Sequence, residues 1–178
     1  DWTYLFLSPL KDKEELHTLL TKQEASADPY YFSIVSKETG KAIGTFSLMR
    51  IEPKYRVIEV GAVTYSDTLK HTRIATEAQY LLAKYVFEPL QYRRYEWKCD
   101  SLNMPSRRAA ERLGFIYEGT FRQAVVYKGR SRDTAWFSMI DKEWSHNKRS
   151  FERWLSKDNF DSQGKQKQSL QTIRQLAK

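Results

Sequence analysis

The sequence predicts one α+β domain whose sheet is mostly antiparallel and contains a single central pair of parallel strands. Runs of aromatic and β-branched residues recur along the chain, as expected for strands, and turn signals join several of them into hairpins. Thr72–Glu88, the longest stretch with helical periodicity, separates the third strand from the fourth. Parallel neighbours in one sheet require a crossover of this kind, so this helix sets the fold class.

The first third of the chain predicts a helix followed by a hairpin. Lys11–Thr21 carries leucines at helical spacing, at positions 16, 19 and 20. Tyr30–Val35 and Ile43–Ile51 are expected to be strands, and Lys37–Gly40 between them is typical of a turn.

Val57–Tyr65 is expected to be the third strand, after an interruption at Glu52–Arg56. Successive side chains of a strand point to opposite faces of its sheet. The pattern therefore predicts two faces, with Ile58, Val60 and Ala62 on one and Glu59 and Gly61 on the other.

The second half predicts three further strands and two more helices. Pro89 ends the long helix, and Gly114 ends the next one because glycine readily adopts the left-handed conformation. Lys128–Ser131 is expected to be a hairpin turn. The expected elements are the strand Arg94–Cys99, the helix Met104–Leu113, the strands Phe115–Tyr127 and Thr134–Ile140, and the helix Asp141–Leu155. Residues 157–178, rich in Gln and Lys, are expected to form a peripheral helix or a loose tail.

Composition excludes several classes of protein. No apolar run approaches the roughly 20 residues of a membrane-spanning helix, so no membrane partner is expected. The single cysteine, Cys99, excludes an internal disulfide and indicates a reducing, cytoplasmic location. The three histidines, at positions 17, 71 and 146, show no metal-ligand spacing, and no metal is expected. Trp97 and Trp136 lie in predicted strands and are expected in the core.

The net charge of +8 is concentrated in the second half of the chain. Residues 1–90 hold 11 Lys and Arg against 12 Asp and Glu, a balance of −1, whereas residues 91–178 hold 19 against 10, a balance of +9. A basic half indicates an anionic partner, such as a nucleotide cofactor, nucleic acid or an acidic protein surface, or else a solvated surface.

Glu96–Phe115 is the most informative segment, because it reads as a strand, a tight connection, a basic helix and a glycine stop. Asn103 is placed to cap the helix and Pro105 suits its first turn. Ser106, Arg107 and Arg108 put a hydroxyl and two cations beside the free N–H groups of that turn. Cations at a helix N-terminus oppose the helix dipole, but together with free N–H groups they form an anion site.

This segment resembles the GNAT superfamily of acetyl-CoA-dependent N-acetyltransferases, in its RimJ/RimL branch. The resemblance covers roughly residues 32 to 144 and implies direct acetyl transfer from acetyl-CoA to a primary amine. It also implies a further strand and helix at the start, so residues 1–156 are expected to be one N-acetyltransferase domain that lacks them. The family frame N-x-x-S, G-F and E-G is filled here by Asn103, Ser106, Gly114, Phe115, Glu118 and Gly119.

The resemblance implies a set of residues that contact the cofactor acetyl-CoA. A Q/R-x-x-G-x-G/A loop at the start of the long helix holds the pyrophosphate in the family, and Lys70, Arg73 and Ala75 take its positions here. Arg73 departs from the family's glycine. Asn103 and Ser106 are expected to contact the cofactor, with Ser106 assisting the departing thiolate. The strand residues Ala62, Val63 and Thr64 are expected to offer backbone groups to the pantetheine arm and the acetyl carbonyl.

The general base is less clearly indicated. The resemblance implies a glutamate shortly after the Glu118–Ala124 segment, where this chain carries Val125. Glu59 is the substitute that the strand alternation favours, with an ordinary ion pair as its alternative role. Asp133 and Tyr127 are further candidates, and deprotonation through water, or an amine bound already neutral, needs no dedicated base.

Two other functions remain open at this stage. One is a GNAT fold that binds acyl-CoA without turnover, because Arg73 and Val125 depart from the family pattern. The other is a basic nucleic-acid-binding module, which the charge favours but no recognisable motif supports. The acceptor amine, a protein N-terminus or a small molecule, and the oligomeric state are not indicated by the sequence.

Overall fold

The computed structural model describes residues 2–176, which form six strands, five α-helices and one short 3-10 helix. Boundaries follow capping groups where the sequence supplies them; for example, Asp12 accepts a hydrogen bond from the backbone N–H of Glu15 and starts the first helix. The elements are α1 Lys13–Glu24, β1 Tyr30–Val35, β2 Ala42–Glu52, β3 Val57–Tyr65, α2 Arg73–Phe87, β4 Arg94–Asp100, α3 Met104–Leu113, β5 Ile116–Tyr127, β6 Arg130–Ile140, α4 Asp141–Leu155, η1 Lys157–Asn159 and α5 Leu170–Leu176.

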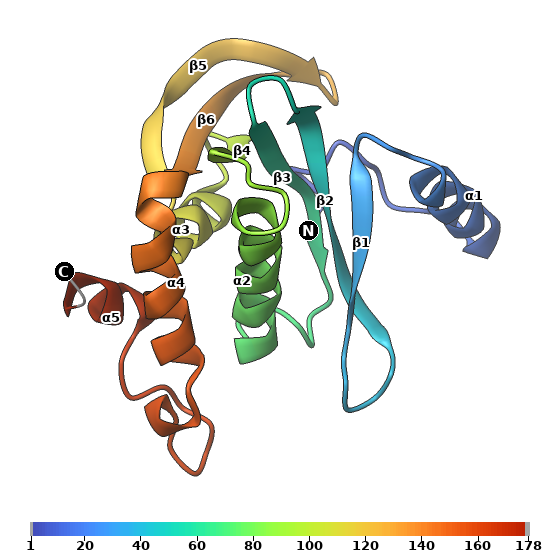
Figure 1. Cartoon of the computed structure of the whole chain (residues 1–178). Helices are drawn as coiled ribbons and strands as arrows, with labels where there is room; N and C mark the ends of the chain where they lie inside the picture. The colour runs from blue at the N-terminus through green and yellow to red at the C-terminus, as the bar shows by residue number, and fades with distance from the viewer. Residues whose placement is uncertain (1, 177–178) are drawn as a thin grey trace.

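All six strands form one sheet in the order β1-β2-β3-β4-β6-β5. The β3–β4 pair is parallel and every other pair is antiparallel, so the predicted fold class is confirmed. Figure 1 shows α2, α3 and α4 against one face of this sheet, with the β5–β6 hairpin curving across one end. Because β3 and β4 run parallel, the helices that follow them, α2 and α3, both begin at the same end of this strand pair.

The core lies between the sheet and helices α2, α3 and α4. Alternate residues of β3, β4 and β6 point into it, and several are completely buried. Trp97 is part of this core, as predicted, and its ring packs edge-on against Phe115 at a centroid distance of 5.7 Å. Trp136 is only half-buried and belongs to the opposite face of the sheet. The core residues from these strands are Ile58, Val60, Tyr95, Trp97, Cys99, Ala135, Phe137 and Met139.

The β5–β6 turn is tighter than the sequence pattern suggested. Lys128 and Gly129 both adopt positive φ angles, 50° and 72°, which is the conformation of a two-residue hairpin turn. The strand β6 therefore begins at Arg130 rather than at Thr134. This extension adds Arg130 and Arg132 to the sheet, where both matter for the site described below.

Residues 157–176 pack onto the domain. Leu170 and Ile173 of α5 are buried, with exposed fractions of 0% and 1%. The guanidinium of Arg174 donates to the backbone carbonyl of Arg112 at 2.9 Å, which satisfies a carbonyl at the C-terminal end of α3. The sequence left two alternatives for this segment, a peripheral helix or a loose tail, and the structure contains a short packed helix. Among residues 2–176, no helix has both the length and the apolar character needed to cross a membrane.

Candidate active site

The parallel strands β3 and β4 separate at one end, and this opening is the centre of the candidate site. Their ladder runs from Val57 opposite Arg94 to Val60 opposite Trp97. Beyond that point β3 still pairs with β2, and β4 still pairs with β6. Within the described residues, the backbone edges of 61–65 and 98–100 that face each other therefore lack a strand partner. An extended amide-bearing ligand can pair with such edges as an additional strand does.

A β-bulge shapes the β3 side of this opening. The register with β2 shifts between Thr45 and Ser47, so Ala62 and Val63 together oppose a single residue. Ala62 adopts φ +50° and is exposed, whereas the simple alternation placed it on the buried face with Ile58 and Val60. That prediction is wrong because a bulge inserts one extra residue and reverses the facing of the residues after it. The predicted positions Ala62, Val63 and Thr64 do lie along the opening.

On the β4 side, the start of α3 brings Asn103 and Ser106 to the opening. Asn103 caps the helix, because its side-chain oxygen accepts from the backbone N–H of Ser106 at 3.2 Å. Gly114 ends the helix in the left-handed conformation, at φ 102°. Both terminal assignments from the sequence are confirmed. The cap thus belongs to Asn103, and the hydroxyl of Ser106 takes no part in it.

The Ser106 hydroxyl is hydrogen-bonded to a side chain of β4. The indole N–H of Trp97 donates to Ser106 Oγ at 3.0 Å, which uses the oxygen as an acceptor and leaves its own proton available for donation. Cys99 lies on the same face of β4. Burial raises the pKa of its thiol, and a hydrogen bond with Ser106 only partly offsets this, so Cys99 is a neutral thiol rather than a nucleophile.

The start of α2 forms the other helix terminus at the opening. Thr72 caps it by accepting from the backbone N–H of Ala75 at 3.2 Å. Lys70 bonds Asp67 at 2.7 Å, and the guanidinium of Arg73 donates to the carbonyl of Leu155. Arg73 also lies 4.7 Å above the ring of Phe160, so the structure directs it toward the C-terminal segment. All three predicted residues lie at this helix start, but each cation already has an intramolecular partner.

Replacing both Lys70 and Arg73 by alanine should raise the acetyl-CoA concentration needed for half-saturation and flatten its dependence on salt, because two positive charges near a helix N-terminus are lost. Arg73→Ala alone should also lower the melting temperature, since it loses its bond to Leu155. Titrations of acetyl-CoA and of dephosphorylated pantetheine at two salt concentrations measure the effect. If the wild type binds both ligands equally well, the charges at this helix start have no role in phosphate binding.

Glu59 lies on the sheet face opposite the helices, as the alternation predicted, but it is not open to solvent. Its exposed fraction is 6%, and its carboxylate accepts from Lys98 Nζ at 2.8 Å and lies 3.4 Å from Arg50 Nε. Burial raises the pKa of Glu59, and Lys98 and Arg50 only partly offset the effect. A carboxylate with a raised pKa suits a proton acceptor, while its ion pair with Lys98 has a structural role.

Lys98 was missed by the sequence reasoning, although the pattern contains it. Polar and apolar residues alternate along β4, so the position of Lys98 puts it on the face of Glu59. It bonds Glu59 and, at 2.7 Å, Glu96, and its ammonium lies 3.7 Å from the ring centroid of Trp136. Burial disfavours the charged form of Glu96, but bonds from Lys98 and Arg94 outweigh this and lower its pKa. Lys98 thus neutralises two buried carboxylates beside the opening.

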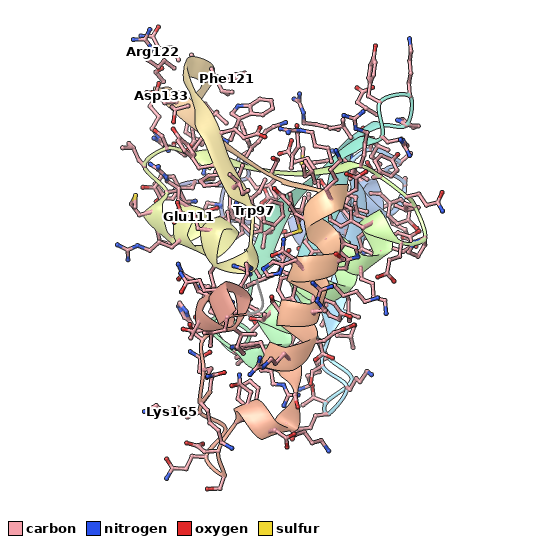
Figure 2. All side chains as sticks on the ribbon, turned by 60° about the vertical axis from the view of Figure 1, so that its left-hand side comes forward. Trp97, Glu111, Phe121, Arg122, Asp133 and Lys165 are labelled. Atoms are coloured by element: carbon pink, nitrogen blue, oxygen red, sulfur yellow. The ribbon has the colours of Figure 1, made fainter. Side chains whose placement is uncertain are left out.

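The remaining candidates lie further along the β5–β6 hairpin. Figure 2 shows Phe121, Arg122 and Asp133 together at one end of the molecule and Trp97 in its middle. Asp133 accepts from the backbone N–H of Gln123 at 2.7 Å, and its own carbonyl accepts from Ser101, which extends the β4–β6 pairing. The hydroxyl of Tyr127 donates to Asp100. Both candidate bases therefore hold the hairpin in place.

The residues present fit the acetyl-CoA that the family resemblance implies. Two helix N-termini converge on the opening, unpaired strand edges face it, and Ser106 can donate a proton into it. Amide groups of an extended arm match the strand edges, and phosphate oxygens match helix N-termini. Within residues 2–176, no group of three His, Cys, Asp or Glu side chains is arranged to bind a metal ion.

Comparison with known proteins agrees with this geometry. The family described as "Acetyltransferase (GNAT) domain" matches residues 2–116. A crystal structure of a GCN5-related N-acetyltransferase from Brucella melitensis is 48% identical, with a TM-score of 0.96 over 98% of this chain and 79% of that one. An uncharacterized N-acetyltransferase, p20, from Bacillus licheniformis is 29% identical over 147 residues, which are 80% of this chain and 81% of that protein.

A more distant structure shares the fold alone. It is a spermidine N-acetyltransferase mutant from Vibrio cholerae, which is 19% identical, with a TM-score of 0.63 over 80% of this chain and 83% of that one. The match to the family covers more than half of the chain and includes β3, α2, β4 and α3, the elements that form the opening. The chain therefore belongs to the GNAT family of acetyltransferases.

Proposed function

We propose that this protein transfers the acetyl group of acetyl-CoA directly to a primary amine. The observation that carries the proposal is the opening between β3 and β4, with the Ala62 bulge on its β3 side and the start of α3, which carries Ser106, directly after β4. This arrangement supplies unpaired backbone for the pantetheine arm on one side and a proton donor, Ser106, on the other. The RimJ/RimL resemblance of the Asn103–Ser106 segment supports the same assignment.

The reaction needs no covalent enzyme intermediate. The amine nitrogen forms a bond to the thioester carbonyl carbon, and the carbon–sulfur bond breaks. In this proposal the thiolate takes a proton from Ser106, which regains one from solvent, and the nitrogen loses one to solvent or to Glu59. We propose that a backbone N–H at the bulge stabilises the developing negative charge on the carbonyl oxygen.

Two measurements test the proposal in sequence. Thermal unfolding with and without acetyl-CoA detects cofactor binding, because a ligand that binds only the folded state raises its stability. Release of free thiol in the presence of a panel of amines then detects turnover. Stabilisation without thiol release from any amine would favour an acyl-CoA-binding protein without turnover. Absence of both stabilisation and thiol release would favour the alternative of a basic nucleic-acid-binding module.

Glu59→Gln should lower turnover and steepen its dependence on pH, while acetyl-CoA affinity stays the same. The amide keeps the shape of the carboxylate and its contact with Lys98, but it cannot accept a proton. Rate profiles between pH 6 and pH 9, at saturating acetyl-CoA, measure the effect.

Glu88→Gln is the matched control for this variant. Glu88 also accepts from a lysine, Lys148 at 2.7 Å, but it lies at the end of α2 and not on the face of Glu59. The control should leave the rate profile unchanged. Full turnover of Glu59→Gln across neutral pH would assign Glu59 a purely structural role and favour proton transfer to water.

The proposed acceptor is the amine of a protein N-terminus or of a small molecule. A cytoplasmic location is part of the proposal, because Cys99 is a free buried thiol and acetyl-CoA is the donor. Nucleic acid and membranes are not proposed as partners.

A further inference from the structure

Among the described residues, three successive side chains on one face of β6 carry polar atoms without a hydrogen-bond partner. They are Arg132 at Nε, Thr134 at its hydroxyl and Trp136 at its indole nitrogen, and all three atoms are buried. The exposed fractions of Arg132 and Thr134 are 7% and 6%. Buried polar groups in folded proteins are nearly always hydrogen-bonded, so three exceptions in a row indicate a ligand that supplies the missing partners.

The row lies next to the opening between β3 and β4. Thr134 pairs with Asp100, and Trp136 pairs with Lys98, in the β4–β6 ladder. Residues directly opposite in a ladder share a face of the sheet, so the row lies on the face of Glu59 and not on the face of Ser106. Adjacent strands are about 5 Å apart, which places the row one strand from the opening. This is the face by which the amine would approach the acetyl group.

The guanidinium of Arg132 has no carboxylate partner among the described residues. It lies 5.2 Å from the ring centroid of Phe6 and 5.8 Å from that of Tyr127. A ring in contact with the face of a guanidinium leaves the N–H groups in its plane unused. Asp100, the nearest carboxylate in the ladder, is taken by Arg130 at 2.8 Å and by Tyr127 at 2.9 Å.

The chemical character of the row is that of an anion site. An arginine N–H and an indole N–H can only donate, and a threonine hydroxyl can donate as well. Lys98 and Arg50 lie 3.7 and 5.9 Å from the ring centroid of Trp136, but Glu59 and Glu96 already neutralise Lys98, so the charge of the row comes from Arg132.

We propose that the row Arg132–Thr134–Trp136 binds an anionic group of the acceptor, so that the acceptor is an amine carrying a carboxylate rather than a polyamine. This inference rests on the proposed acetyl transfer. The carboxylate accepts hydrogen bonds from donors of the row while the amine, a few bonds away, reaches the opening between the strands. A polycationic amine would place positive charge beside the unpaired guanidinium of Arg132 and is disfavoured.

The test compares acceptors that differ only in charge. One arm uses free amino acids against their carboxamides, and the other uses peptides with Asp against Asn at the second position, with spermidine as the cationic reference. The carboxylate form should show a kcat/KM at least about tenfold higher than its neutral counterpart, because its absence leaves buried donors unpaired. The arm that shows this preference identifies the source of the carboxylate as a free amino acid or a peptide.

Variants assign the preference to the row. Trp136→Phe keeps the ring and removes the N–H, and Thr134→Val keeps the shape and removes the hydroxyl. Each should raise the KM of the carboxylate acceptor about tenfold and lower its advantage over the neutral one, without changing the KM of acetyl-CoA. Trp154→Phe and Thr172→Val, which lie on α4 and α5, are matched controls. Arg132→Gln should abolish the preference where it folds.

Calorimetric titration of the acceptors into the protein with CoA bound provides a readout independent of turnover. The carboxylate acceptor should bind more tightly than the neutral one to the wild type, and equally to Trp136→Phe. The anion site would be overturned if neutral acceptors or spermidine showed a kcat/KM equal to or above that of the carboxylate acceptor, and if carboxylate and neutral acceptors bound with equal affinity. Acetyl transfer itself would stand in that case. Absence of thiol release with every acceptor would overturn the proposed function, and calorimetry would still decide whether the row binds a carboxylate.

Discussion

Replacing Ser106 by alanine should lower acetyl transfer by roughly 10- to 100-fold, while the KM of acetyl-CoA changes little. The expected loss is in kcat, because the hydroxyl acts on the departing sulfur and not on the bound substrate. The Asn103 cap uses the backbone N–H of Ser106 and survives the substitution. Stability should nevertheless fall by about 1–3 kcal/mol, since the buried indole N–H of Trp97 loses its acceptor.

Steady-state kinetics together with urea unfolding separate these two effects. Ser150→Ala is a suitable control, because it also removes a buried hydroxyl, one that donates to the carbonyl of His146 within α4. The control should lose some stability and keep full turnover. Unchanged turnover in Ser106→Ala would remove Ser106 from the chemistry and leave the hydroxyl as a partner for Trp97 alone.

Lys98→Met should destabilise the protein by about 3–5 kcal/mol at pH 7, because it leaves two buried carboxylates without their shared cation. Glu59 and Glu96 both bond the lysine, and both are 6% exposed. Methionine matches the length of the aliphatic stem and still packs on Trp136, so packing loss is kept small. Urea unfolding of both proteins measures the difference.

The effect should depend on pH with a definite sign. In the wild type, the lowered pKa of Glu96 contributes stability above pH 4.5, which is lost as the pH falls through the folded-state pKa. The raised pKa of Glu59 acts in the opposite sense, and its contribution is lost as the pH rises. Without Lys98, only Arg50 and Arg94 remain to offset the burial of Glu59 and Glu96, so the pKa of both carboxyls should rise. The variant should therefore be weakest relative to the wild type at neutral pH and approach it below pH 4.5.

Lys70→Met provides the comparison for a solvent-exposed ion pair. Lys70 bonds Asp67 at the same distance, 2.7 Å, that joins Lys98 to Glu96, but its carboxylate partner is 95% exposed. Exposed pairs contribute about 0–1 kcal/mol, so this variant should be nearly as stable as the wild type. If Lys98→Met behaves in the same way at pH 7, the buried carboxylates must already be protonated or solvated there.

Local chemistry settles much of this structure. Asn103 caps α3 and Gly114 ends it because a side-chain oxygen and a missing Cβ satisfy the needs of helix termini without help from distant residues. The long periodic helix between two strands predicts the parallel pair, since no shorter connection could return the chain. The family frame around Asn103 and Ser106 depends on the same local features.

Other features could not be predicted, because they depend on which segments lie side by side. The bulge at Ala62 exists only in the pairing of β3 with β2. It turns Ala62 to the exposed side, whereas simple alternation had placed this residue on the buried face. Arg73 turned toward Leu155 because the C-terminal segment packs beside α2, more than 80 residues away along the chain. Trp136 lies outside the core because its neighbours Ala135 and Phe137 take the face of β6 that the helices cover.

The sequence by itself determined the fold class, the helix termini and the placement of Ser106 at a helix start, because each rests on interactions within a few residues. Only the tertiary structure decided which charges are paired and which are not. Lys98 donates a hydrogen bond to Glu59 across the parallel ladder, 39 residues away in sequence, and Asp100 is paired with Arg130 of β6. Among the described residues, Arg132 Nε is left without a hydrogen-bond partner. Pairing of buried charge is a property of packed strands, so it becomes defined when the sheet forms.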